Sequence, residues 1–102
     1  MDRVAFINYI EESNISHADV LTKFFDQYMV LYNLIEKIDK ISFINSDNNS
    51  VTFQLYCTDS DIWKPIIDRI NYQSMVVIYD KCFNVSYANI TMNTIDINIS
   101  LM

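Results

Sequence analysis

The chain has 102 residues, 51% of them hydrophobic, and carries 13 acidic against 7 basic side chains, which gives a formal net charge of −6. These values predict one folded domain over residues 1–102, and they argue against direct binding to nucleic acid or to an anionic membrane, both of which attract positive charge. Because no apolar run approaches the ~20 residues of a membrane-spanning helix, and the first residues lack the pattern of a signal peptide, we expect a soluble, cytoplasmic protein.

The first third of the chain predicts two helices. Apolar residues recur every three positions from Val4 to Ile10, which predicts a short helix over residues 3–12. A longer helix is expected after Ser16, which together with Asp19 resembles a capping box. Its apolar stripe extends over about six turns. The residues of this stripe are Leu21, Phe24, Phe25, Tyr28, Tyr32, Ile35 and Ile38.

A hairpin and a further helix are predicted in the middle of the chain. The apolar segments "ISFIN" and "VTFQLYC" are separated by "SDNNS", whose Asn and Asp residues tolerate the backbone conformations of tight turns. The next segment has helical spacing and should begin near residue 60, capped by Thr58, Asp59 or Ser60. Pro65 fits such a helix only in its first turn. The apolar residues of this helix are Ile62, Trp63, Ile66, Ile67 and Ile70.

The last third predicts three strands, namely "SMVVIYD", residues 82–91 and residues 94–101, with turns around Asp80 and Asn93. The middle strand changes the parity of its apolar residues, so we expect a β-bulge near Ala88 and Asn89. The final strand alternates strictly, with isoleucines on one side and polar residues on the other, as is typical of a half-buried strand.

Together these elements predict an α+β fold. Two amphipathic helices can bury their apolar stripes only against the strands, so we expect a five-stranded antiparallel sheet with a long N-terminal helix and a shorter second helix on one face. The order of hairpin, helix and three-strand meander resembles the topology of profilin-like, Roadblock and PAS-type domains. This resemblance implies that the last strand lies in the middle of the sheet, beside the first strand.

No catalytic constellation is complete in the sequence. Asp59 and Asp61 follow a strand, as the aspartates of haloacid dehalogenase-type phosphotransferases do, but Trp63 stands where that pattern has Thr or Val. The chain has one histidine, His17, and no glycine, which excludes a phosphate-binding P-loop and a triad or zinc site of the usual kind. We therefore expect no enzymatic activity, no cofactor and no metal. The two cysteines are expected to be reduced core thiols.

The remaining candidate residues are acids and aromatic residues that could bind a partner. The acids lie at the hairpin tip and on the second predicted helix, and the aromatic residues lie nearby in sequence, so that carboxylates could steer the chain toward a basic protein and aromatic rings could anchor it. They are Asp47, Asp59, Asp61, Asp68, Trp63, Tyr56 and Tyr72. The alternative interpretation is that Trp63 belongs to the core and the acids are merely solvated.

The functional hypothesis from sequence is a small acidic, non-enzymatic protein that inhibits a basic partner. In size, acidity and lack of catalytic residues the chain is similar to bacterial immunity proteins and phage-encoded inhibitors, which implies a nuclease toxin or another nucleic-acid-handling protein as target. The abundance of Ile and Asn reflects A/T-rich codons, which are frequent in phage-derived and mobile elements. Two alternatives remain, a dimeric interaction or chaperone module and a small-molecule sensor of PAS-like or profilin-like shape. The protein could be a monomer or a homodimer.

Overall fold

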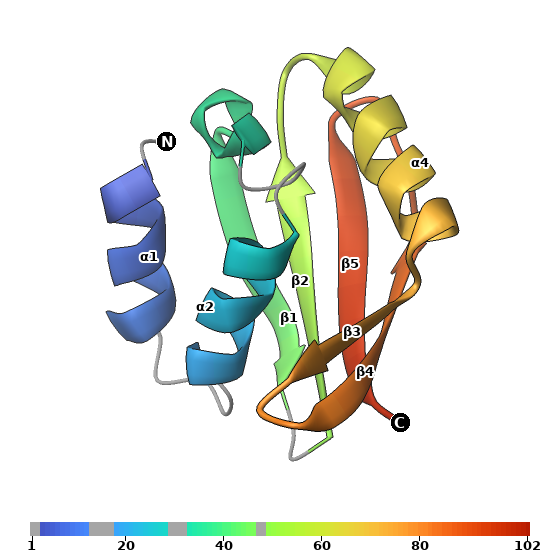
Figure 1. The fold of residues 1–102 in the computed structure, drawn as a ribbon. Coiled ribbons are helices and arrows are strands. Elements are labelled where there is room, and N and C mark those ends of the chain that lie inside the picture. Colours follow the sequence, from blue (N-terminus) through green and yellow to red (C-terminus); the bar gives the residue numbers. More distant parts are fainter. Residues whose placement is uncertain (1–2, 13–17, 29–32, 47–48) are drawn as a thin grey trace.

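The computed structural model describes residues 3–12, 18–28, 33–46 and 49–102 and shows a five-stranded antiparallel sheet with its helices on one face (Figure 1). The strands are β1 Lys40–Ser46, β2 Ser50–Tyr56, β3 Met75–Ile78, β4 Lys81–Ala88 and β5 Thr94–Leu101. The helices are α1 Arg3–Glu12, α2 Ala18–Gln27 and α4 Trp63–Tyr72, and the 3-10 turns are η1 Ile35–Lys37 and η2 Ser60–Ile62. The predicted α+β class and the order of its elements are confirmed.

The strands lie in the order β1-β2-β5-β4-β3, so the last strand occupies the centre of the sheet as predicted. Its neighbours are β2 and β4, and not β1, which differs from the arrangement that the PAS-type resemblance implied. Strands β2 and β5 pair along their whole length, from Ser50 opposite Ser100 to Tyr56 opposite Thr94. Strand β1 instead forms an edge of the sheet and contains a register shift at Ile44, an irregularity that edge strands tolerate.

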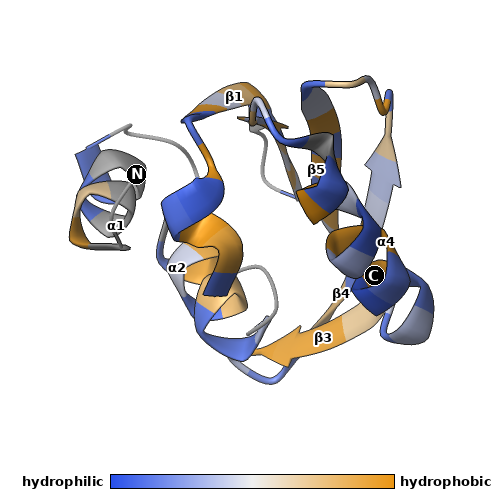
Figure 2. Ribbon diagram, turned by 90° about the horizontal axis from the view of Figure 1, so that it is seen from above, coloured by the Kyte–Doolittle hydropathy of each residue, from blue (hydrophilic) through white to orange (hydrophobic). Residues whose placement is uncertain are grey.

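The core lies between the sheet and the helices α2 and α4, which contribute to one continuous apolar cluster. The isoleucines of β5 are fully buried in it, so the long apolar face of the last strand is covered, as its alternation predicts. The ring centroids of Phe25 on α2 and Phe53 on β2 are 5.6 Å apart. The sheet curves around α2 from β1 to β3 (Figure 2), and Gln27 at the end of α2 donates a hydrogen bond to the carbonyl of Val77 on β3.

The first long helix is shorter than the sequence predicts, although its apolar stripe is buried. Helix α2 ends at Gln27, and Tyr28 lies outside it with its ring stacked on Phe24 and its hydroxyl donating to the carbonyl of Gln73. Ile35 belongs to the 3-10 turn η1. A continuous helix of six turns would measure about 32 Å, nearly the longest dimension of the molecule, 34 Å. Ending α2 early lets Ile35 and Ile38 pack on the core. Ser16 and Tyr32 lie outside the described residues.

The turns of the second half also correct the prediction. Strand β4 ends at Ala88, and Asn89 has a φ angle of 52°, so a loop replaces the expected bulge. The β3–β4 hairpin turns at Tyr79 and Asp80, whose φ angles are 51° and 63°. Positive values at both central residues are the geometry of a type I′ turn, which matches the twist of the paired strands. In a chain without glycine, these residues must adopt the left-handed conformation themselves.

The two cysteines have different environments. Cys57 is buried and its thiol donates to the carbonyl of Lys37, so the core position predicted for it is confirmed. Cys82 is exposed, and the prediction of a second core thiol was wrong, because its register opposite Val77 places it on the face of the sheet away from the helices. No helix within the described ranges is long and apolar enough to cross a membrane.

Candidate protein-binding surface

Helix α4 has one side in the core and one side in solvent. Its inner side consists of Trp63, Ile66 and Ile70, and Trp63 is only 3% exposed. Trp63 is therefore removed from the predicted binding surface, because it shares the apolar helical stripe that packs on the sheet. Pro65 lies in the first turn of α4 as predicted. The 3-10 turn η2 begins at residue 60, and Asp59 accepts a hydrogen bond of 3.0 Å from the amide of Asp61 there, whereas α4 itself begins at Trp63 after Ile62, which makes no side-chain cap.

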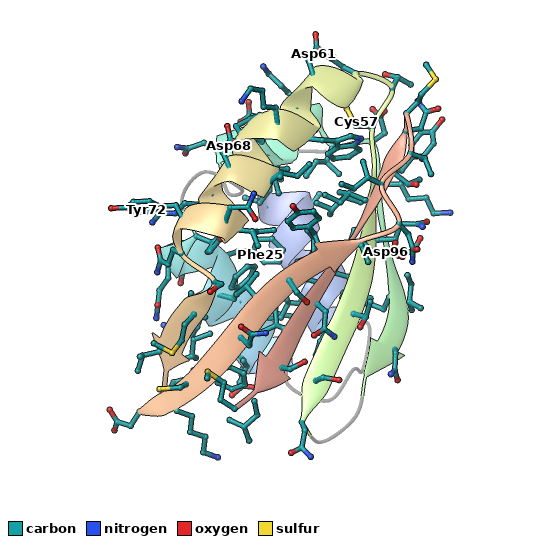
Figure 3. All side chains as sticks on the ribbon, turned by 90° about the vertical axis from the view of Figure 1, so that its right-hand side faces the viewer. Phe25, Cys57, Asp61, Asp68, Tyr72 and Asp96 are labelled. Atoms are coloured by element: carbon teal, nitrogen blue, oxygen red, sulfur yellow. The ribbon has the colours of Figure 1, made fainter. Side chains whose placement is uncertain are left out.

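The outer side of η2 and α4 presents most of the predicted binding residues together. Asp61, Asp68 and Tyr72 follow one another along this side and point away from the sheet (Figure 3). Residues seven and four positions apart share one side of a helix, which explains their alignment. Tyr72 is 83% exposed, an unusual position for a large aromatic side chain. We call Asp59, Asp61, Asp68 and Tyr72 the α4 ridge.

The ridge contains an ion pair one turn from Tyr72. The ammonium of Lys64 donates to Oδ2 of Asp68 at 2.8 Å, and both side chains are exposed. This hydrogen bond and the charge of Asp68 raise the pKa of Lys64 above its ordinary value. Exposed pairs of this i,i+4 type contribute little to stability, so Asp68 can exchange Lys64 for another cation.

Arg69 is a residue of this surface that sequence reasoning did not identify. Its guanidinium lies over the rings of both Tyr28 and Tyr72, at 5.7 Å from each centroid. Tyr28 is buried beneath it, and burial raises the pKa of the Tyr28 hydroxyl to about 12, an effect that the charge of Arg69 partly opposes. Arg69 thus links the exposed ring of Tyr72 to a ring in the core. No sequence pattern joins positions 28 and 69.

The other predicted site residues do not join the ridge. Tyr56 is 39% exposed but lies on the outer face of the sheet, which points away from α2 and α4, because its neighbour Leu55 faces the core. Asp47 lies outside the described residues. The structure therefore brings together four of the seven predicted residues.

The outer face of the sheet has polar side chains that form hydrogen bonds with one another. Asp96, on the central strand β5, is only 8% exposed although α2 and α4 lie on the other face of the sheet. Its carboxylate accepts hydrogen bonds from the side-chain amides of Gln54 at 3.0 Å and Asn89 at 2.9 Å. Next to it, the amide of Asn98 donates to the hydroxyl of Thr52 at 2.7 Å. These polar groups are therefore satisfied within the sheet, while Met75 and Val77 on the same face are exposed.

The structure also bears on the two alternative functions. The carbonyls of Met75 and Val77 on the edge strand β3 accept hydrogen bonds from Gln73 and Gln27, at 3.4 Å and 2.8 Å. Glutamine side chains thus occupy backbone acceptors that an added strand would need, which disfavours a dimer through this edge.

A hollow lined by core side chains including Leu21 has a volume of about 10 Å³, no more than one water molecule requires. Such a volume does not favour a sensor cavity there.

Among the residues that the structure describes, no group of three or more His, Cys, Asp or Glu side chains could hold a metal ion. In comparisons with known proteins, no family model, no curated protein and no solved structure matches the chain. Its function is therefore inferred from the geometry of the α4 ridge.

Proposed function

We propose that this protein is a non-enzymatic binding protein that inhibits a basic partner protein by covering its basic surface with the α4 ridge. The observation that carries the proposal is the position of the exposed Asp61 and Asp68 and of Tyr72, which is 83% exposed, along one side of η2 and α4, with the exposed Asp59 directly before η2. The opposite side of the same helix is anchored in the core by Trp63, Ile66 and Ile70.

This arrangement suits tight association for two physical reasons. A helix that is already ordered loses little conformational entropy when it binds, so more of the contact energy appears as affinity. Tyrosine is one of the residues that most often contribute large binding energies in protein interfaces. The aspartates and the net charge of −6 would accelerate the encounter with a positive surface.

The target class follows from the chemistry of a basic surface. Proteins that handle nucleic acid carry clustered Lys and Arg side chains that neutralise phosphates. An acidic ridge can pair with the same side chains and so exclude the nucleic acid. The small size and acidity of the chain, which are similar to those of immunity proteins and phage inhibitors, favour a nuclease toxin or a related protein as the target.

Site-specific photo-crosslinking in the native host tests this proposal. A photoreactive phenylalanine analogue replaces Lys64, which lies between the ridge aspartates and is 81% exposed in its side chain. The control places the analogue at Asn84, which is exposed on the outer face of the sheet. We expect position 64, and not position 84, to capture a basic protein whose activity the purified chain inhibits. Equal capture at both positions, or a captured protein that is acidic or keeps its activity, would contradict the proposal.

A further inference from the structure

We propose that the group recognised by the α4 ridge is an arginine side chain of the partner, which stacks on the ring of Tyr72 and pairs with the carboxylate of Asp68. This inference rests on the proposed function of the ridge and specifies the chemistry of its partner. Tyr72 supplies the platform, Asp68 supplies the acceptor and Arg69 acts as a positioning residue.

The ring of Tyr72 already accommodates a guanidinium. Arg69 lies over this ring at 5.7 Å from its centroid, within the range of a cation–π contact. With 83% of Tyr72 exposed, a second planar cation has access to the ring from solvent. Guanidinium stacks on aromatic rings more readily than ammonium does because it is planar and weakly hydrated. Arginine is therefore favoured over lysine as the partner residue.

Asp68 lies where the stacked guanidinium would need an acceptor. It precedes Tyr72 by one helical turn on the same side of α4 (Figure 3). Its Oδ2 accepts the ammonium of Lys64, while Oδ1 makes no hydrogen bond within the described part of the chain. A guanidinium can offer two parallel N–H donors to one carboxylate, which a lysine cannot. An incoming arginine would thus replace Lys64 with a better geometric match.

The platform is connected to the core, and this connection sets its orientation. Arg69 lies over Tyr72 and also over the buried ring of Tyr28, whose hydroxyl donates to the carbonyl of Gln73 at 3.1 Å. Tyr28 further stacks on Phe24, with ring centroids 4.8 Å apart. The position of Tyr72 is therefore tied to the packing between α2 and α4, which reduces the entropy lost when an arginine binds.

A second acidic surface of the molecule provides the competing site and the matched control. A surface hollow of about 280 Å³ is lined by Glu11, Asp19, Lys23 and Tyr79 among others. It also combines carboxylates with an exposed tyrosine, so it tests whether acids near any tyrosine are sufficient. Lys23 lines this hollow, just as Lys64 and Arg69 flank Asp68 and Tyr72, so both surfaces combine acids, a tyrosine and basic side chains and can be compared directly.

The test uses two peptides, acetylated hexa-arginine amide and acetylated hexa-lysine amide, titrated into the isotope-labelled chain and followed by NMR. We expect the largest shifts in α4 near Asp68 and Tyr72, and an affinity for hexa-arginine at least about three-fold above that for hexa-lysine. Tyr72→Ala should weaken hexa-arginine binding about three-fold or more, while Tyr72→Phe should preserve it because the ring face remains. Tyr79→Ala should leave the affinity unchanged.

Three results would overturn the inference: equal affinities for the two peptides, the largest shifts around Glu11 and Asp19, or no effect of Tyr72→Ala. Thermal melting of the Tyr72→Ala variant checks that the fold is retained, which we expect for so exposed a side chain. Any of these results would leave the proposed function standing if crosslinking at position 64 still captures a basic protein. Conversely, failure of the crosslinking experiment would remove the function without depending on peptide affinities.

Discussion

The substitution Ile97→Asp tests whether the last strand holds the molecule together. Ile97 is fully buried at the centre of β5, in register with Phe53 on β2 and Tyr87 on β4. Removing a buried isoleucine side chain typically costs about 2–5 kcal/mol, and burying a carboxylate without a partner adds several kcal/mol. The sum approaches or exceeds the ~5–15 kcal/mol by which a domain of this size is stable. We expect the variant to be unfolded or insoluble.

Circular dichroism and size-exclusion chromatography measure this outcome, and Asn98→Asp provides the matched control one residue away. Asn98 lies on the outer face and donates to the hydroxyl of Thr52 at 2.7 Å. An aspartate there can accept a hydrogen bond from the same hydroxyl, so the loss should be about 1 kcal/mol and cooperative melting should persist. If Ile97→Asp gives a monomer that melts cooperatively, the strand is not part of the core and the reasoning is refuted.

Three further predictions follow from the charges and hydrogen bonds. Raising the salt concentration from about 50 to about 500 mM should slow association with the partner severalfold and change dissociation less, and an on-rate independent of salt would contradict charge steering. Since the folded pKa of Tyr28 is raised to about 12 from its ordinary value of 10.0, its contribution to stability is complete below pH 10 and is lost as the pH rises toward 12. Urea unfolding of Tyr28→Phe should lack that part of the alkaline loss, and equal losses in both chains would contradict it. Replacing Gln27 and Gln73 together by Ala should uncover the carbonyls of β3 and increase self-association in sedimentation experiments, whereas unchanged association would show that these amides do not protect the edge.

Periodicity in the sequence predicts the parts of the fold in which one face is buried along a whole element. The alternating isoleucines of β5 and the apolar stripe of α4 are examples, because each residue's burial follows from its place in the repeat. The end of α2 could not be predicted in this way. Tyr28 continues the helical stripe in sequence, yet its hydroxyl binds Gln73, a residue 45 positions away. Such a contact exists only after the chain has folded.

The candidate site likewise has a part that the sequence predicts and a part that it does not. The spacing of Asp61, Asp68 and Tyr72 places them on one side of a helix, and the structure shows that arrangement. The same spacing assigns Trp63 to the opposite side of the helix, with Ile66 and Ile70. The burial of Trp63 therefore agrees with the helical pattern, and the prediction that Trp63 belongs to the binding surface was wrong. The role of Arg69 depends on the distance to Tyr28, which periodicity does not encode.

Stability and recognition are separated on the two sides of α4, and this separation can be measured. The inner side shares one core with β5, so Ile97→Asp should destroy the α4 ridge together with the fold. The outer side makes few contacts that the fold requires, so Tyr72→Ala should lower peptide affinity while the melting temperature stays nearly constant. Arg69→Met is the intermediate case, because the methionine can still cover Tyr28 but carries no charge to hold the ring of Tyr72. Its affinity for hexa-arginine should fall although its stability changes little, and an unchanged affinity would show that Tyr72 needs no positioning residue.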